Sequence, residues 1–382
     1  MKSVFFAFVY IITLAVCLMP SNTNAQLMFG RAFMQGDHLE IGINECATYG
    51  ASPNIVAGYH SNSYAVGMVA DADKDGWSIG DPAFCGDYFL PGSPVEGWGV
   101  QVNGSTYRNS QLCNSYHDIP GSITAFSETG GLITTTWNGQ VAGLDIFNTV
   151  SFGEKDLYVT HEITLCNTTN ADMNDVFYLR HIDPDNEAFW PDSLFITSTE
   201  NEVVRQGGSG MGSLVTATGV NTGCFFGMGT SDENSRVSFG GFFEPDTIRH
   251  VWDGVFPYNH SGINYADEAI SMAIRRDIPA RESVKLSFTY VFSENDIDPA
   301  IQATTTTCIP SFSIGTANGD FLDGVVLEEI NSSGSGGSPA GFTDFGSQVA
   351  VLSPGLNYGL QLTNTPSYSE VYEAWIDYNR ND

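Results

Sequence analysis

The chain has 382 residues, with 44 acidic side chains against 14 lysines and arginines and a formal net charge of −30. Such a charge repels nucleic acid and anionic membranes, so neither is an expected partner. Because 42% of the residues are hydrophobic and 12% are aromatic, disorder is excluded, and the length favours one large domain followed by a smaller one.

The N-terminus predicts export. Lys2 precedes an apolar run from Val4 to Leu18, and small residues before the end of segment 1–25 are typical of a cleaved signal peptide. The run is too short for a spanning helix, so no membrane insertion is expected after cleavage. A lipoprotein signal at Cys17 is the alternative. We expect a secreted or cell-surface protein that is exported through the Sec route.

Strand patterns follow the signal in close succession. In the segment Leu157–Leu165, apolar residues and His161 alternate with polar residues, which is typical of a half-buried antiparallel strand. The same alternation appears in three other segments, 64–70, 132–137 and 284–292. Gly-containing turns separate these segments. The fold class is therefore predicted as all-β, a large antiparallel β-sandwich followed by a smaller β-sandwich domain.

The strand pattern weakens after Phe292. We assign residues 26–295 to the large domain, the polar segment 296–306 to a linker and residues 307–382 to the smaller domain. Loss of Cys17 with the signal would leave six cysteines, which predicts up to three disulfides in an exported protein, with 15 possible connectivities. The pairs that are nearest in sequence are Cys85–Cys113 and Cys166–Cys224.

Two segments are candidate calcium sites. The first is a D-x-D-x-D-G run in which Asp71, Asp73 and Asp75 alternate, with Asp81 close to where an EF-type loop places its last carboxylate. A plain β-hairpin tip is the alternative. In the second segment, the candidate ligands are Asp183, Asp185 and Asn186. Its alternative is a turn that is held by an ion pair of Arg180.

Sites for sugars or catalysis are less marked. Trp98, Trp190 and Trp252 lie near turn residues and are candidates for a platform on which a glycan stacks, although such rings more often fill a core. His161 shares its face with apolar residues, so we expect a buried histidine with hydrogen-bond partners. The sequence holds no H-E-x-x-H motif.

The C-terminal part resembles the GEVED domain of secreted bacterial surface proteins. This resemblance implies an accessory β-sandwich without known catalysis in a bacterial protein. The acidic motif that names the family would lie beyond Asp382, so we expect a truncated domain and further domains after it. The matching segments are Cys308–Pro310, Gly324–Asn331, Gly341–Phe345, Leu352–Tyr358 and Trp375–Arg380.

The first part is similar to β-supersandwich modules of bacterial surface and adhesin-like proteins, through Gly86–Pro94 and the strands Leu157–Leu165 and Asn174–Arg180. From these features we expect a non-catalytic adhesion module, with calcium-stiffened loops, that binds a glycan or an extracellular protein. Relatives of the supersandwich include mutarotases and lyases, so a carbohydrate-active enzyme of lyase or mutarotase type is the alternative. A purely structural spacer is a third hypothesis.

Overall fold

The computed structural model describes residues 25–51, 58–60, 65–77, 87–88, 95–110, 113, 116–186, 197–242, 247–305 and 321–334, together with 336, 350, 352–353 and 356–364. Over these residues the chain is all-β, as predicted, and its strands pair in the antiparallel direction. Helix is limited there to α1 (Thr247–Asp253), α2 (Ile297–Gln302) and the 3-10 turn η2 (Glu294–Asp296).

Four sheets are formed. A four-stranded sheet has the order β1 (Ala25–Met28), β2 (Arg31–Gln35), β3 (Leu39–Ile43) and β4 (Met68–Ala70). A nine-stranded sheet has the order β17 (Gly262–Ala266), β13 (Thr199–Arg205), β14 (Leu214–Gly219), β15 (Phe225–Gly229), β19 (Ser283–Val291), β11 (Tyr158–Asn167), β10 (Leu144–Gly153), β9 (Leu132–Val141) and β8 (Gly121–Thr129).

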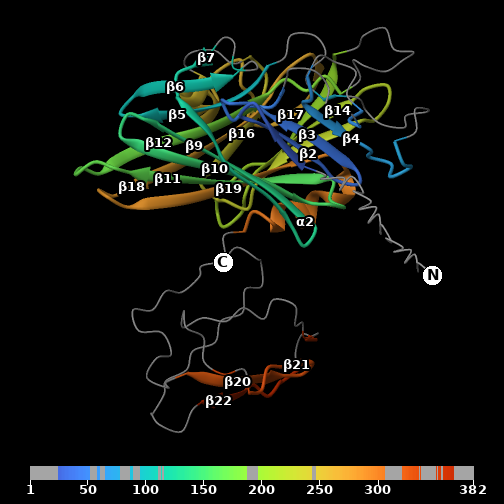
Figure 1. Ribbon diagram of the computed structural model, residues 1–382, viewed down its shortest axis with the longest axis vertical. Helices are drawn as coiled ribbons and strands as arrows, with labels where there is room; N and C mark the ends of the chain where they lie inside the picture. Colours follow the sequence, from blue (N-terminus) through green and yellow to red (C-terminus); the bar gives the residue numbers. More distant parts are fainter. Residues whose placement is uncertain are drawn as a thin grey trace, which may run out of the picture.

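A six-stranded sheet has the order β16 (Ser235–Phe239), β18 (Ile270–Ile278), β12 (Met173–Ile182), β5 (Glu96–Val102), β6 (Ser105–Ser110) and β7 (Tyr116–His117). The fourth sheet has three strands, β21 (Ile330–Asn331), β20 (Leu322–Leu327) and β22 (Gln361–Asn364). Figure 1 shows the three larger sheets together in one body and the three-stranded sheet apart from it.

The main core lies where the nine-stranded and six-stranded sheets share one apolar cluster. Ile163 and Leu165 of β11 belong to it, as do Val100 of β5 and Tyr178 of β12. Burial alternates along β11 as the sequence predicts, because every second side chain of a strand points to the same face. The predicted environment of His161 is also confirmed: the ring is buried and lies 2.9 Å from the hydroxyl of Tyr49.

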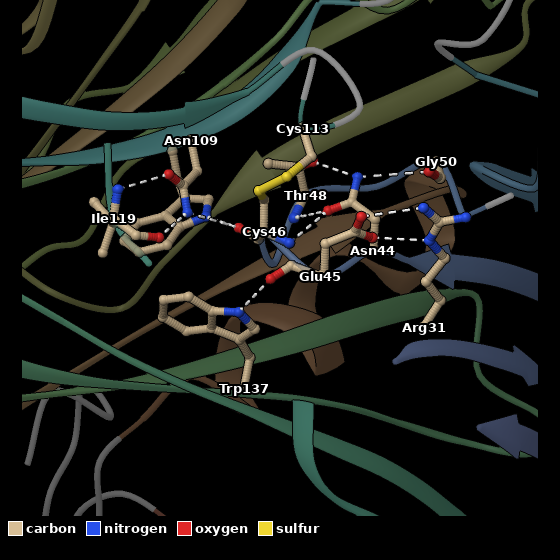
Figure 2. Close-up of a disulfide and its surroundings, with 11 residues drawn as sticks. Arg31, Asn44, Glu45, Cys46, Thr48, Gly50, Asn109, Cys113, Ile119 and Trp137 are labelled. Atoms are coloured by element: carbon tan, nitrogen blue, oxygen red, sulfur yellow. Dashed lines mark hydrogen bonds and ion pairs between the residues drawn. A yellow bond between two sulfur atoms is a disulfide. The ribbon is translucent and has the colours of Figure 1, made fainter. Parts of the chain in front are cut away.

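The chain turn after β3 organises one edge of this core. The indole of Trp98 donates a hydrogen bond to the carbonyl of Cys46, and that of Trp137 donates to the carbonyl of Glu45, each over 2.8 Å. Figure 2 shows Trp137, Glu45 and the disulfide in this arrangement. Because its donor is satisfied inside the core, Trp98 is fully buried. The assignment of Trp98 to a glycan platform is therefore wrong.

The predicted disulfide pairs are also wrong. Cys113 is bonded to Cys46, 67 residues away in sequence, and Cys166 is a free thiol. Cys224 is disulfide-bonded, and its partner lies outside the described residues. Cys85 also lies outside them. The prediction used sequence distance, whereas the folded sheets bring the turn after β3 against the segment that follows β6.

The segment predicted as a linker, 296–306, begins with a helix that packs on the large body. Ala300 of α2 is buried in a cluster with Phe225 and Val291. Residues 297–302 are therefore part of that body, because Ile297 also packs against this cluster. The described residues include no helix with the length and apolar character needed to cross a membrane.

Candidate functional site

The four-stranded sheet carries a histidine–carboxylate pair. The Glu40 side chain is fully buried, on the side of β3 opposite to the core residues Leu39 and Ile41. Nδ1 of His60 lies 2.7 Å from Oε1 of Glu40, and the backbone N–H of His60 donates to Oε2 over 2.7 Å. The His60 side chain keeps 35% of its exposure. Burial raises the pKa of Glu40, while the hydrogen bonds from His60 act in the opposite direction.

A second pair lies at the start of the same strand. Nδ1 of His38 is 3.3 Å from Oδ2 of Asp71, whose side chain is buried, whereas the His38 side chain is 22% exposed. The segment Asp71–Trp77 connects the two pairs, because the Trp77 ring stacks on His60 with 4.3 Å between centroids and 1° between planes. Trp77 also donates its indole N–H to the carbonyl of Asp37. We call His38, Glu40, His60, Asp71 and Trp77 the dyad face.

The dyad face has the groups that proton transfer requires. A carboxylate beside Nδ1 holds an imidazole in one tautomer and orientation and leaves Nε2 to exchange a proton. Trp77 adopts φ of +64°, a left-handed conformation that is rare for residues with a side chain and is concentrated at functional sites. The sequence interpretation missed this face. The only local sign of the dyad face in the sequence was that the polar residues His38 and Glu40 stand on either side of the apolar Leu39.

The D-x-D-x-D-G run becomes a turn at the edge of the dyad face. Oδ1 of Asp71 accepts the N–H of Asp75 and Oδ2 accepts that of Gly76, each over 3.1 Å. Asp73 and Asp75 are exposed, and within the described chain neither joins a convergent group of metal-ligand atoms. Asp81 lies outside the described residues. Calcium binding by this run stays a prediction.

The second predicted cation segment is brought together with a third carboxylate. Asp183 and Asp185 follow β12, and Asp267 lies in the turn between β17 and β18. One oxygen of each carboxylate lies within 4.8 Å of the other two. Burial and the charge of Asp267 raise the pKa of Asp183 to about 7, and burial and both neighbouring carboxylates raise that of Asp185 to about 9. We call these three residues the carboxylate cluster.

Asn186, which was predicted as a ligand, has a different observed contact. Its amide nitrogen donates to the carbonyls of Ala217 and Cys224, each over 2.7 Å. It thereby ties the end of the cluster segment to β14 and to the residue before β15. Asn186 is completely buried. The structure therefore places Asp183, Asp185 and Asp267 near one another, while Asn186 is anchored through its amide nitrogen and its role as a ligand stays a prediction.

The proposed aromatic platform does not assemble. Trp98 belongs to the main core, whereas the half-buried Trp252 packs against a separate cluster with Phe177. The guanidinium of Arg236 lies 5.1 Å from the centre of the Trp252 ring and covers one of its faces. Trp190 lies outside the described residues. Trp77, which the sequence interpretation left aside, is the described tryptophan that adjoins titratable groups at the surface.

A third group of polar residues is sealed inside the core. Arg180 forms an ion pair of 2.5 Å with Glu96, and both side chains are at most 1% exposed. Tyr290 accepts a hydrogen bond from Arg180 and donates one to Glu96. The predicted pairing of Arg180 with an aspartate is therefore wrong. Because every member is closed off from solvent, we assign this network to stability.

No family model and no curated protein matches the chain. Among solved structures it is similar to a bacterial glucoamylase complexed with acarbose, with 8% identity and a TM-score of 0.37 over 72% of this chain and 32% of that one. It is also similar to a polysaccharide lyase, with 10% identity and a TM-score of 0.34 over 87% of this chain and 43% of the lyase. The chain thus spans less than half the length of these two proteins.

A third similar structure is described as an aldose 1-epimerase from Klebsiella pneumoniae, with 9% identity and a TM-score of 0.30 over 72% of this chain and 82% of that one. All three are carbohydrate-active enzymes, and none is an adhesin. The expectation of a non-catalytic adhesion module is therefore corrected. At these TM-scores the similar structures transfer no activity, so a function must come from the residues of this chain.

Proposed function

We propose that this chain is an exported carbohydrate-active enzyme that interconverts the anomers of a neutral sugar by acid–base catalysis at the dyad face. The observation that supports this most is the 2.7 Å contact between the half-exposed His60 and the fully buried Glu40. A buried carboxylate behind an accessible imidazole is the arrangement that orients a general base. The second pair, His38 with Asp71, supplies the partner acid.

The reaction needs both groups at once. His60 takes the proton from the anomeric hydroxyl while protonated His38 gives a proton to the ring oxygen, so the bond between the anomeric carbon and the ring oxygen breaks and a carbonyl forms. Rotation and the reverse transfers then close the ring as the other anomer. An imidazole can accept a proton as well as donate one, so one histidine can act as the base and the other as the acid. No atoms are gained or lost overall.

The charge of the protein favours a neutral substrate. A lyase acts on acidic polysaccharides, which a chain of net charge −30 repels. Each histidine of the dyad face has a carboxylate beside it, so this face offers no uncompensated cation to an acidic substrate. A neutral sugar avoids this repulsion.

Export is part of the same proposal. The Cys46–Cys113 disulfide supports it, because disulfides persist in oxidising compartments and are rare in the cytosol. The signal peptide, residues 1–25, lies almost entirely outside the described residues and stays a prediction. A neutral glycan or free sugar outside the cytoplasm is then the proposed partner.

The test is anomer exchange, followed by polarimetry and by NMR on a panel of neutral aldoses. Wild-type protein should accelerate the exchange of at least one of them. His60→Gln should lower kcat by about 100-fold or more, in the range that general acid–base catalysis contributes. The exposed His117→Gln is the matched control and should keep full activity. Absence of acceleration by wild-type protein, or an active His60→Gln variant, would refute the proposal.

Glu40→Gln separates positioning from contact with the sugar. Because Glu40 is buried and acts through His60, its loss should lower kcat and shift the pH profile, with little change in KM. A proportional rise in KM alone would indicate that Glu40 only shapes the binding surface. Circular dichroism of each variant checks that the fold is intact.

A further inference from the structure

The carboxylate cluster presents a converging set of oxygens at a site separate from the dyad face. A cation such as Ca²⁺ is bound at about 2.4 Å, so two of its ligand oxygens can be at most about 4.8 Å apart. The oxygens of Asp183, Asp185 and Asp267 meet this limit in every pair. Asp183 and Asp185 are 8% and 3% exposed, and Asp267 is exposed, so the cluster is open on one side.

An independent observation points to a ligand. Oδ1 of Asp183 is buried and has no hydrogen-bond partner among the described residues. A buried carboxylate oxygen without a partner is costly, because the charged form has lost its hydration. Two more carboxylates beside it increase this cost by repulsion. A bound cation would satisfy the orphan oxygen and remove the repulsion together.

The backbone holds two of the carboxylates in place before any ligand arrives. The N–H of Asp183 donates to the carbonyl of Val95 over 2.8 Å, and that of Asp185 donates to the carbonyl of Tyr88 over 2.6 Å. Pro184 between them restricts Asp183 to extended conformations. Asn186, the residue after Asp185, is held in place by its own two amide hydrogen bonds. A rigid, all-oxygen group of this kind suits a hard cation.

We propose that Asp183, Asp185 and Asp267 bind a divalent cation of the Ca²⁺ class. The donor set argues for this class, because three carboxylates without His or Cys select hard cations over Zn²⁺ or Cu²⁺. The bound ion would join the end of β12, an inner strand of the six-stranded sheet, to the turn that connects β17, an edge strand of the nine-stranded sheet, with β18. This inference does not depend on the proposed anomer exchange.

The experiment measures binding of Ca²⁺ alone to metal-stripped protein by calorimetry, with terbium luminescence as a second readout. Wild-type protein should bind one ion at the cluster. Asp267→Asn is the main variant, since its side chain is exposed and its loss does not endanger the core. It should weaken binding by about tenfold or more, because one of three anionic ligands is gone. Asp185→Asn should weaken it at least as much.

Asp73→Asn is the matched control, because it removes an exposed carboxylate from the competing D-x-D-x-D-G run. It should leave the affinity unchanged. The proposal is overturned if wild-type protein binds no Ca²⁺, or if Asp73→Asn abolishes binding while Asp267→Asn retains it. Anomer exchange assayed in the same Asp267→Asn protein shows whether the two sites are independent.

Discussion

The dyad face and the core network are built from the same kinds of groups and differ mainly in their access to water. The core network consists of Arg180, Glu96 and Tyr290, and each region combines a buried carboxylate, a nitrogen-containing partner and an aromatic ring. In the core network, Arg180 and Glu96 are completely enclosed, and His161 packs against Tyr49 nearby. On the dyad face, the carboxylates of Glu40 and Asp71 are enclosed, whereas His60 keeps about a third of its exposure.

This difference assigns the two regions separate roles. A charge that is buried together with its partner cannot meet a substrate, so its interactions contribute to folding. A carboxylate that is buried behind an exposed imidazole can transmit its charge to a bound molecule. Replacing a residue of the core network should therefore change stability, whereas His60→Gln should change stability by less than about 1 kcal/mol.

The largest expected effect is on the core network. Arg180→Met leaves the Glu96 carboxylate buried without its cation, so the free energy of unfolding should fall by about 3–5 kcal/mol. Urea unfolding at neutral pH measures this loss. Arg275→Met is the matched control, because Arg275 forms an ion pair with Asp175 at the surface, where such pairs contribute at most about 1 kcal/mol. Equal losses in the two variants would contradict the distinction between the regions.

The disulfide should have the next largest effect. Cys46→Ser with Cys113→Ser releases a loop whose ends are 67 residues apart, so unfolding should become easier by about 2–4 kcal/mol. Cys166→Ser is the control, since Cys166 is a free thiol and its removal breaks no cross-link. If oxidised wild-type protein and the double variant unfold at the same urea concentration, the cross-link does not constrain the unfolded chain.

The sequence predicts what is local and misses what the sheets bring together. The alternation at Leu157–Leu165 was correct, because period two within one strand decides which side chains face the core. The proximity of Asp183 and Asp185 was predictable because only Pro184 separates them in the chain. Asp267 was not, since it joins them only through the turn before β18, more than eighty residues later.

The dyad face shows the same limit more sharply. His60 comes from a segment between β3 and β4 and reaches Glu40 across the outer surface of the sheet. In the sequence, Glu40 looks like an ordinary polar residue of an alternating strand. The error with Trp98 has a related cause, because its hydrogen-bond acceptor at Cys46 is 52 residues away in sequence. Only the folded chain shows which polar atoms meet a partner.

The smallest expected effect, up to about 1.4 kcal/mol for each pH unit, is a pH dependence that tests how tightly the core is closed. Burial lowers the pKa of His181 to about 3, and its Nδ1 lies 2.7 Å from the hydroxyl of Ser271. In the unfolded chain a histidine titrates near about 6.5. Between these values the unfolded state holds a proton that the folded state does not. The contribution of neutral His181 to stability is therefore complete above pH of about 6.5 and is lost as the pH falls toward about 3.

His181→Asn isolates this contribution from the carboxylates of the cluster, whose raised pKa values act in the opposite direction. The variant should be less stable than wild type at neutral pH. Below pH of about 6 the difference should shrink by up to about 1.4 kcal/mol for each pH unit, since only the wild type must exclude a proton from this site. Urea unfolding at several pH values measures both curves. Parallel curves would mean that water reaches His181 in the folded protein, and the sealed core would then resemble the dyad face more closely than its burial indicates.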